Sequence, residues 1–121
     1  MMKKQTNSNR GERIASTVQR FVAEILRDDY GEDETLSRVS VVGAESSGGL
    51  QFARIWYYFR GVNGDGFDAA VQKRLDALTP TIRHELARRM NQKFVPNIKF
   101  VYDATLETGE RIEELLENIE L

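Results

Sequence analysis

The sequence predicts a single α+β domain in which helices pack against a three-stranded sheet, in the order α-β-β-α-kink-α-β. Apolar residues recur at three- and four-residue steps over residues 14–26 and again over residues 67–94, a spacing typical of amphipathic helices. Short runs rich in β-branched and aromatic residues lie between these segments and after them, as expected for strands. A chain of 121 residues also has the length of one domain.

The first predicted helix spans residues 10–31. Its apolar face comprises Ile14, Val18, Phe21, Val22, Ile25 and Leu26. Arg13, Arg20 and Arg27 are spaced by seven and therefore fall on nearly one line of the opposite face. Residues 1–9 are polar, so we expect a disordered N-terminal segment before a folded domain of residues 10–103.

Two predicted strands follow, over residues 36–44 and 50–60. The segment between them is short and contains Ser46, Ser47, Gly48 and Gly49, which favours a turn and therefore an antiparallel hairpin. Side chains alternate across a strand. One face of the second strand should carry Ala53, Ile55, Tyr57 and Phe59, and the other Phe52, Arg54, Trp56 and Tyr58.

The second half of the domain should contain two helices and a last strand. Residues 67–78 and 80–93 both show helical periodicity, but the kink residues Leu78, Thr79 and Pro80 separate them. Proline is unfavourable inside a helix and favourable at its first position, so we expect a break, with Thr79 as the N-cap of a new helix. Residues 98–102 predict the third strand, and residues 104–121 form an acidic tail with partly helical apolar spacing.

The composition argues against most catalytic and metal-dependent functions. The chain has no cysteine and one histidine, His84, and it contains neither a phosphate-binding loop motif nor a nucleophile-elbow motif, so we expect no enzyme activity, no metal and no cofactor. Asp103, Glu107 and Glu110 are more simply read as polar surface and a turn than as catalytic carboxylates. Gly61 and Gly64 formally spell the Gly-x-x-Gly clamp of K-homology domains, but a plain loop is the simpler reading.

The start of the chain does not resemble a signal peptide, and no apolar stretch approaches membrane-spanning length. We therefore expect a soluble cytoplasmic protein that binds no membrane.

Charge is strongly segregated along the chain. Residues 71–99 contain seven cations and two acids, whereas residues 103–121 contain seven acids and one cation, Arg111. Together with the arginines of the first helix, the cations could bind phosphates of a structured RNA. An ordinary solvated basic face explains the same pattern about equally well, and a surface for an acidic protein partner is a further alternative.

Three stretches resemble bacterial ribosome-binding factor A. RIASTVQRFVAEIL, residues 13–26, is similar to the opening helix of that family, and VSVVGAESSGGLQFARIWYYF, residues 39–59, to its hairpin. The most specific resemblance lies in residues 82–116. The positions that match the family pattern in order are Ile82-Arg83, Pro96-Asn97-Ile98-Lys99-Phe100, Asp103, Thr105, Gly109, Arg111-Ile112 and Leu115-Leu116. One departure is Leu78-Thr79-Pro80, where the family usually carries Ala-x-Gly.

The resemblance implies a type II K-homology-like fold without the Gly-x-x-Gly clamp. It also implies a non-enzymatic factor of small (30S) ribosomal subunit assembly, acting on 16S-type rRNA maturation and supporting growth in the cold. The small subunit and its precursor would be the main partners, with ribosomal proteins or an assembly GTPase as further candidates, and we expect a monomer.

The resemblance and the charge pattern together select the candidate RNA contacts. The main contacts are predicted at Arg83, Arg88, Arg89 and Lys93, with secondary contacts at Lys73, Arg74, Arg13 and Arg20, and with His84 and Lys99 as additional members.

Overall fold

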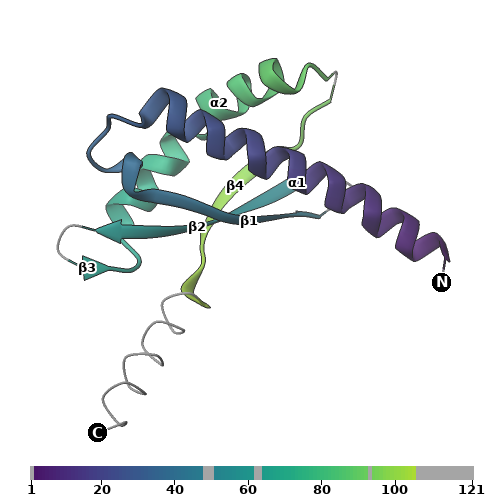
Figure 1. Cartoon of the computed structure of the whole chain (residues 1–121), viewed down its shortest axis with the longest axis horizontal. Coiled ribbons are helices and arrows are strands. Elements are labelled where there is room, and N and C mark those ends of the chain that lie inside the picture. Colours follow the sequence, from purple (N-terminus) through teal and green to yellow (C-terminus); the bar gives the residue numbers. More distant parts are fainter. Residues whose placement is uncertain (1, 48–50, 62–63, 93, 106–121) are drawn as a thin grey trace, which may run out of the picture.

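A computed structural model describes residues 2–47, 51–61, 64–92 and 94–105, with the backbone alone for residues 2–9, 64 and 65 (Figure 1). The elements are helix α1 (Met2–Tyr30), the 3₁₀ turn η1 (Leu36–Arg38), strands β1 (Val39–Ser47), β2 (Phe52–Gly61) and β3 (Gly64–Asp65), helix α2 (Ala69–Met90) and strand β4 (Asn97–Tyr102).

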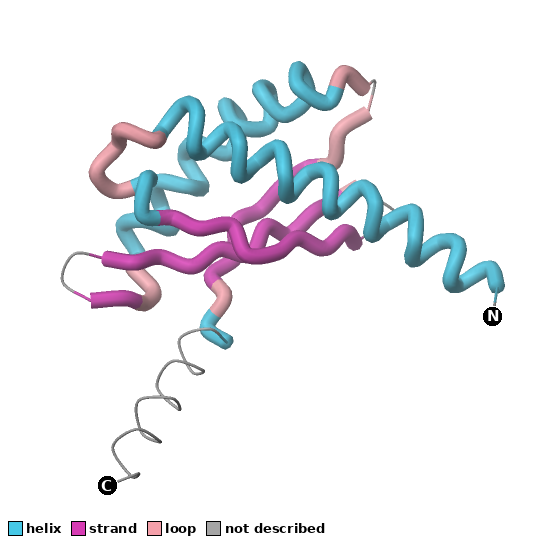
Figure 2. The backbone as a smooth tube through the Cα atoms, in the orientation of Figure 1, coloured by secondary structure: helices cyan, strands magenta, loops and turns pink. Residues whose placement is uncertain are grey.

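Strand β2 is the centre of a mixed sheet. β1 pairs with it antiparallel, so the predicted hairpin is confirmed, and β4 pairs with it parallel on the other side. The chain reaches β4 through α2, as parallel neighbours require a crossover connection. The two-residue β3 pairs only with the end of β2. Figure 2 shows the three main strands side by side, with β3 as a short extension. The predicted α+β fold with a three-stranded sheet is confirmed.

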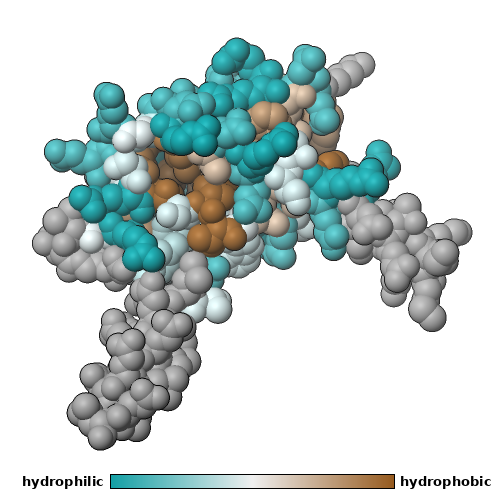
Figure 3. Space-filling view, viewed as in Figure 1, coloured by the Kyte–Doolittle hydropathy of each residue, from teal (hydrophilic) through white to brown (hydrophobic). Residues whose placement is uncertain are grey.

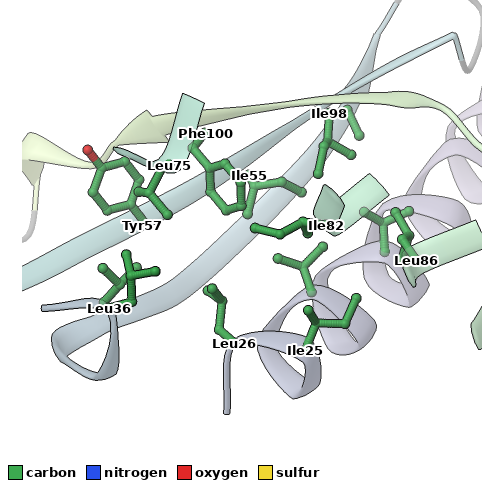
Figure 4. Close-up of a cluster of buried hydrophobic side chains, with 14 of the residues drawn as sticks. Ile25, Leu26, Leu36, Ile55, Tyr57, Leu75, Ile82, Leu86, Ile98 and Phe100 are labelled. Atoms are coloured by element: carbon green, nitrogen blue, oxygen red, sulfur yellow. The ribbon is translucent and has the colours of Figure 1, made fainter. Parts of the chain in front are cut away.

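Both helices pack on one face of the sheet, α1 mainly against β1 and α2 mainly against β4 (Figure 1). The core lies between these layers, as Figure 4 shows for its largest side chains. Ile25 from α1, Ile55 from β2, Ile82 from α2 and Phe100 from β4 are each at most 1% exposed. Burial of such side chains is the main favourable contribution to folding.

The predicted alternation of β2 decides which face meets the helices. Ala53, Ile55, Tyr57 and Phe59 are buried in the core, while Phe52 on the other face is 52% exposed. Tyr58 also belongs to the other face, yet it is buried, because its ring stacks on that of Tyr102. The two faces of β2 therefore follow the sequence pattern, with Tyr58 covered locally.

Strand β1 starts three residues later than predicted. The Asp33 carboxylate accepts hydrogen bonds from the backbone N–H groups of Thr35 and Leu36, both at 2.9 Å, and this arrangement starts the 3₁₀ turn over Leu36–Arg38. Aspartate favours such local turns over an extended strand. A register shift between Val41 and Gly43 then forms a β-bulge.

Helix α1 begins at Met2, eight residues before the predicted start at residue 10, and the disorder of residues 1–9 in solution stays a prediction. Residues 2–9 contain no proline, and extending a helix that has already formed costs little free energy. The helix ends at Tyr30. A Cβ at Gly31 would lie 2.3 Å from the Arg27 carbonyl oxygen, so only glycine fits there without a shift.

Helix α2 is continuous from Ala69 to Met90 and includes Pro80, which corrects the predicted break. Thr79 is not an N-cap, because its hydroxyl donates 2.8 Å back to the Leu75 carbonyl within the same helix. The true N-cap is Asp68, which accepts from the N–H of Ala70, and Asn91 ends the helix in the left-handed region at φ 50°. Packing of Leu75 and Ile82 into the core on either side of the proline holds both halves in one helix.

Candidate nucleic-acid interface

The face of α2 that points away from the sheet carries exposed basic residues. Val71, Leu75, Ile82 and Leu86 are buried, so Lys73, His84 and Arg88 fall on the opposite side of the helix and are exposed. No carboxylate in the described part of the chain pairs with Lys73 or His84. These three residues are the predicted α2 contacts that a phosphate backbone could reach directly.

Arg89 lies between the two helices. Its side chain is 18% exposed, and its guanidinium is 2.9 Å from the Glu85 carboxylate on α2 and 3.1 Å from the Asp28 carboxylate on α1. Glu24 and Asp29 lie 3.8 and 3.9 Å away. Hydrogen bonds from Arg89 and then Arg27 lower the pKa of Asp28. Four acids surround this arginine, so its charge is already neutralised within the protein.

Arg88 shares Glu85 with Arg89 but remains open to solvent. Its Nε lies 3.0 Å from Glu85, and its side chain is 69% exposed. The hydrogen bonds from Arg88 and Arg89 lower the pKa of Glu85 to about 2. Arg88 is open to solvent and Glu85 also accepts a hydrogen bond from Arg89, so Arg88 can exchange Glu85 for a phosphate.

Arg74 pairs with Asp33 in the loop after α1. One guanidinium nitrogen donates to Asp33 at 2.8 Å and a second contacts the other carboxylate oxygen. These hydrogen bonds hold the pKa of Asp33 well below its usual range. Arg74 therefore links α2 to the loop after α1. Its charge is less available to a binding partner than that of Lys73.

Arg83 is half-buried and bonds to backbone. Its Nε donates to the Pro96 carbonyl at 3.1 Å and its Nη2 to the Val95 carbonyl at 2.8 Å. These carbonyls belong to the segment that leads from α2 into β4. Arg83 thus positions the start of β4. Its Nε and Nη2 are both directed at backbone carbonyls of the protein.

On α1, Arg13 and Arg20 are exposed. The Arg20 guanidinium lies 4.8 Å from the ring centroid of Phe21, which holds the side chain against the helix without neutralising it. Neither arginine has a carboxylate partner among the described residues. Both remain candidates for phosphate contacts, on a different helix from Lys73, His84 and Arg88.

Lys99 does not join this surface. It lies on β4 in register with Arg54 of β2, on the face of the sheet opposite the helices. Lys93 falls outside the described residues. The structure therefore brings Lys73, His84 and Arg88 onto one outer face of α2, turns Arg74, Arg83 and Arg89 to intramolecular partners, and separates Lys99 from all of them.

The residues that sequence reasoning missed are the acids that occupy these arginines. Glu85 stands three residues before Arg88 and four before Arg89, spacings that bring side chains together on a helix, so this pairing was detectable from the sequence. Asp28 is 61 residues from Arg89, and Asp33 is 41 residues from Arg74. Only the packing of α1 against α2 brings those pairs together.

A structural role explains the positions of the other candidates that the sequence suggested. Asp103 accepts a hydrogen bond from the Thr105 N–H at 3.0 Å and so forms a turn, as its position after a strand suggested; Glu107 and Glu110 lie outside the described residues. Gly61 and Gly64 pair across β2 and β3.

Residues 2–47, 51–61, 64–92 and 94–105 contain no group of acids or histidine that could hold a metal ion. No helix in these ranges has the length and apolar character needed to cross a bilayer.

Figure 3 shows mostly hydrophilic side chains on the viewed side of the molecule, with a hydrophobic patch between α1 and β1. A cavity of about 350 Å³ lies there, lined by residues that include Leu26, Leu36, Val39 and Val41. Arg27 at its rim is paired with Asp28. The patch is part of the helix–sheet junction.

Comparison with known proteins identifies the family. Residues 10–116 match the family model of ribosome-binding factor A. Curated ribosome-binding factor A from Methylobacillus flagellatus is 31% identical over 90% of this chain and 83% of its own length, and that from Limosilactobacillus fermentum is 37% identical over 91% and 90%.

Solved structures support the same fold. The crystal structure of ribosome-binding factor A from Thermus thermophilus matches with a TM-score of 0.62, over 76% of this chain and 94% of that one, at 16% identity. A homology model of the Thermus thermophilus factor, fitted into a cryo-electron microscopy map of a 30S complex, matches with a TM-score of 0.56 over 74% and 91%, again at 16% identity. The chain has a K-homology-like fold and belongs to the ribosome-binding factor A family.

Proposed function

We propose that this protein is a non-enzymatic factor that binds the small (30S) ribosomal subunit and its precursor, and acts in subunit assembly and 16S-type rRNA maturation. The observation that carries the proposal is the family match over residues 10–116. A second support is the similarity in fold to a factor whose homology model was fitted into a map of a 30S complex. We expect the protein to act in the cytoplasm as a monomer.

The proposed contact surface is the outer side of the two helices. Lys73, His84 and Arg88 on α2 and Arg13 and Arg20 on α1 are exposed, so they can reach phosphates without breaking the core. Phosphate contacts of this kind give affinity for a structured RNA backbone without reading its sequence. Lys93 stays a predicted member of the surface. Binding would hold a local rRNA conformation and exclude premature joining of the large subunit.

The intramolecular ion pairs define the limits of this surface. Arg89 and Arg74 hold the helical layer together, and Arg83 holds the start of β4. We propose that these three shape the surface and that Arg88, Lys73 and His84 contact the RNA. The second candidate is a protein-interaction module whose exposed basic face binds an acidic protein partner. Ribosomal proteins or an assembly GTPase are further proposed partners of the ribosome-bound factor.

The test is co-sedimentation of the protein with small subunits, large subunits and whole ribosomes at two salt concentrations. Salt-sensitive binding to small subunits, weakened by Arg88→Glu, is expected. Arg38→Glu is the matched control, because it makes the same change of charge at an exposed arginine outside both helices. Binding that survives RNase treatment of the target would favour the protein partner, and binding to no particle would overturn the proposal.

A further inference from the structure

The face of the sheet opposite the helices is apolar at its centre. Register places Trp56 of β2 beside Gly43 of β1 and Val101 of β4. Val42, in the bulge of β1, is 38% exposed, and Trp56 and Val101 are half-buried. Within the part of the chain that the structure describes, neither helix covers this face (Figure 1). An apolar strip of Val42, Trp56 and Val101 therefore crosses the three main strands.

A cavity of about 240 Å³ lies on this strip, and the chain leaves the sheet at its rim. Val42, Gly43 and Trp56 line it together with Asp103 and Thr105, which follow β4. The Asp103 N–H donates 2.8 Å to the Tyr57 carbonyl, which fixes the exit point on the sheet. The described part of the chain thus ends, at Thr105, beside the exposed strip.

The sequence of residues 106–121 is suited to cover such a strip. Ile112, Leu115, Leu116 and Ile119 follow the spacing i, i+3, i+4, i+7 and would share one side of a helix. A helix of this length would extend about 24 Å. Neighbouring strands are about 5 Å apart, so such a helix is long enough to cross the three main strands.

Charge is complementary as well. The segment carries six glutamates and one arginine, and on a helix Glu113 and Glu120 flank the apolar stripe. The open face offers Lys99 and Arg54, adjacent in register on β4 and β2. Arg54 pairs with Glu45 at 2.9 Å, whereas Lys99 has no ion-pair partner among the described residues. Lys99 is therefore available to an acidic segment.

We propose that residues 106–121 dock as an amphipathic helix on the open face of the sheet, with their apolar stripe over Val42, Trp56 and Val101 and their glutamates near Lys99. The remaining glutamates would then face solvent and give this side a negative surface. A negative surface repels phosphate, so RNA would approach only the helical side. That consequence rests on the proposed function, whereas the docking itself does not.

Trp56 is the only tryptophan in the chain and lies within the proposed contact, so its fluorescence reports docking in the full-length protein. Leu115→Glu/Leu116→Glu should shift the emission to longer wavelength and raise the acrylamide quenching constant, because the indole becomes exposed. Glu114→Gln/Glu117→Gln, on the opposite side of the predicted helix, is the control and should leave both values unchanged. Unchanged melting temperatures would show that the fold is retained. Equal Trp56 quenching in wild type and the leucine variant would overturn the docking.

A distance measurement separates docking within one chain from contact between two chains. The chain has no cysteine, so a spin label on Glu117→Cys is unique. If the segment docks, the spin label should broaden the NMR signal of the Trp56 indole N–H, even at low protein concentration. An unaffected signal would overturn the proposal. Broadening that appears only when labelled protein is mixed with unlabelled protein would also overturn it, because the segment would then contact a second copy of the chain. Neither readout involves ribosomes, so failure here is distinguishable from failure of the proposed function.

Discussion

The guanidinium of Arg89 lies 3.1 Å from the carboxylate of Asp28, and this contact joins the last turn of α2 to the last turns of α1. Glu85 lies on its other side at 2.9 Å. An arginine that the basic sequence pattern assigns to RNA is therefore a link between two helices. The distinction between linking and contacting arginines can be tested residue by residue.

Replacement of Arg89 by methionine should lower the melting temperature. The change leaves Asp28 and Glu85 without their shared cation and close to Glu24 and Asp29, so like charges would repel at the helix junction. Arg20→Met, on the exposed face of α1, is the control and should melt like the wild type. The linking role would be wrong if Arg89→Met melted at the wild-type temperature.

Replacement of Arg88 by alanine should instead weaken binding to small subunits. One lost phosphate contact reduces the slope of log affinity against log salt by about one. The folded structure should be retained, because the Arg88 side chain is 69% exposed and Glu85 keeps its hydrogen bond from Arg89. Binding measured at several salt concentrations checks this, and an unchanged slope would remove Arg88 from the proposed surface.

The lowered pKa of Glu85 predicts that the folded protein loses stability in acid. Its pKa is lowered from the usual 4.5 to about 2 in the folded protein, mainly by the hydrogen bond from Arg88. A lowered carboxylate pKa contributes stability above the unfolded value, and this contribution is lost as the pH falls toward the folded value. Urea unfolding of Glu85→Gln should therefore show a smaller decline than the wild type between about pH 4.5 and about pH 2.

The matched control for this pH experiment is Glu12→Gln, because Glu12 is exposed and has no ion pair among the described residues. It should keep the wild-type decline. An identical pH profile for Glu85→Gln and Glu12→Gln would contradict the assignment.

Replacement of Arg83 by methionine should destabilise the protein. The variant keeps much of the side-chain volume but leaves the Pro96 and Val95 carbonyls without their charged donor, and hydrogen bonds to charged groups contribute about 1.5–3 kcal/mol. Arg13→Met, on exposed α1, should change the free energy of unfolding by less than about 0.5 kcal/mol. Chemical denaturation of both variants provides the comparison. A stable Arg83→Met that fails to bind small subunits would return Arg83 to the contact surface.

Ile82 tests the packing of α2 beyond the proline. It is fully buried, so Ile82→Ala should reduce the free energy of unfolding by about 2–5 kcal/mol. Phe94 continues the apolar spacing of residues 67–94 but is 60% exposed, so Phe94→Ala should cost less than about 0.5 kcal/mol. Equal losses for the two variants would mean that the end of α2 packs differently.

Much of the fold follows from the sequence because local periodicity reflects burial directly. The alternation in β2 predicted the core residues Ala53, Ile55 and Tyr57, and the apolar spacing in α1 predicted Val18, Val22 and Ile25. The break at Pro80 was wrong because the penalty for an interior proline is local, whereas Leu75 and Ile82 on both sides gain burial in the core. Local propensity was outweighed by tertiary packing.

The sequence by itself determined the α+β order, the family motifs and the separation of basic and acidic segments. Only the tertiary structure decided which cations are available. Asp28 and Asp33 reach Arg89 and Arg74 across 61 and 41 residues, and β4 places Lys99 on the face opposite the helices. The physical reason is that charge is counted along the chain, whereas electrostatic interaction depends on distances in space, which arise only when helices and strands pack.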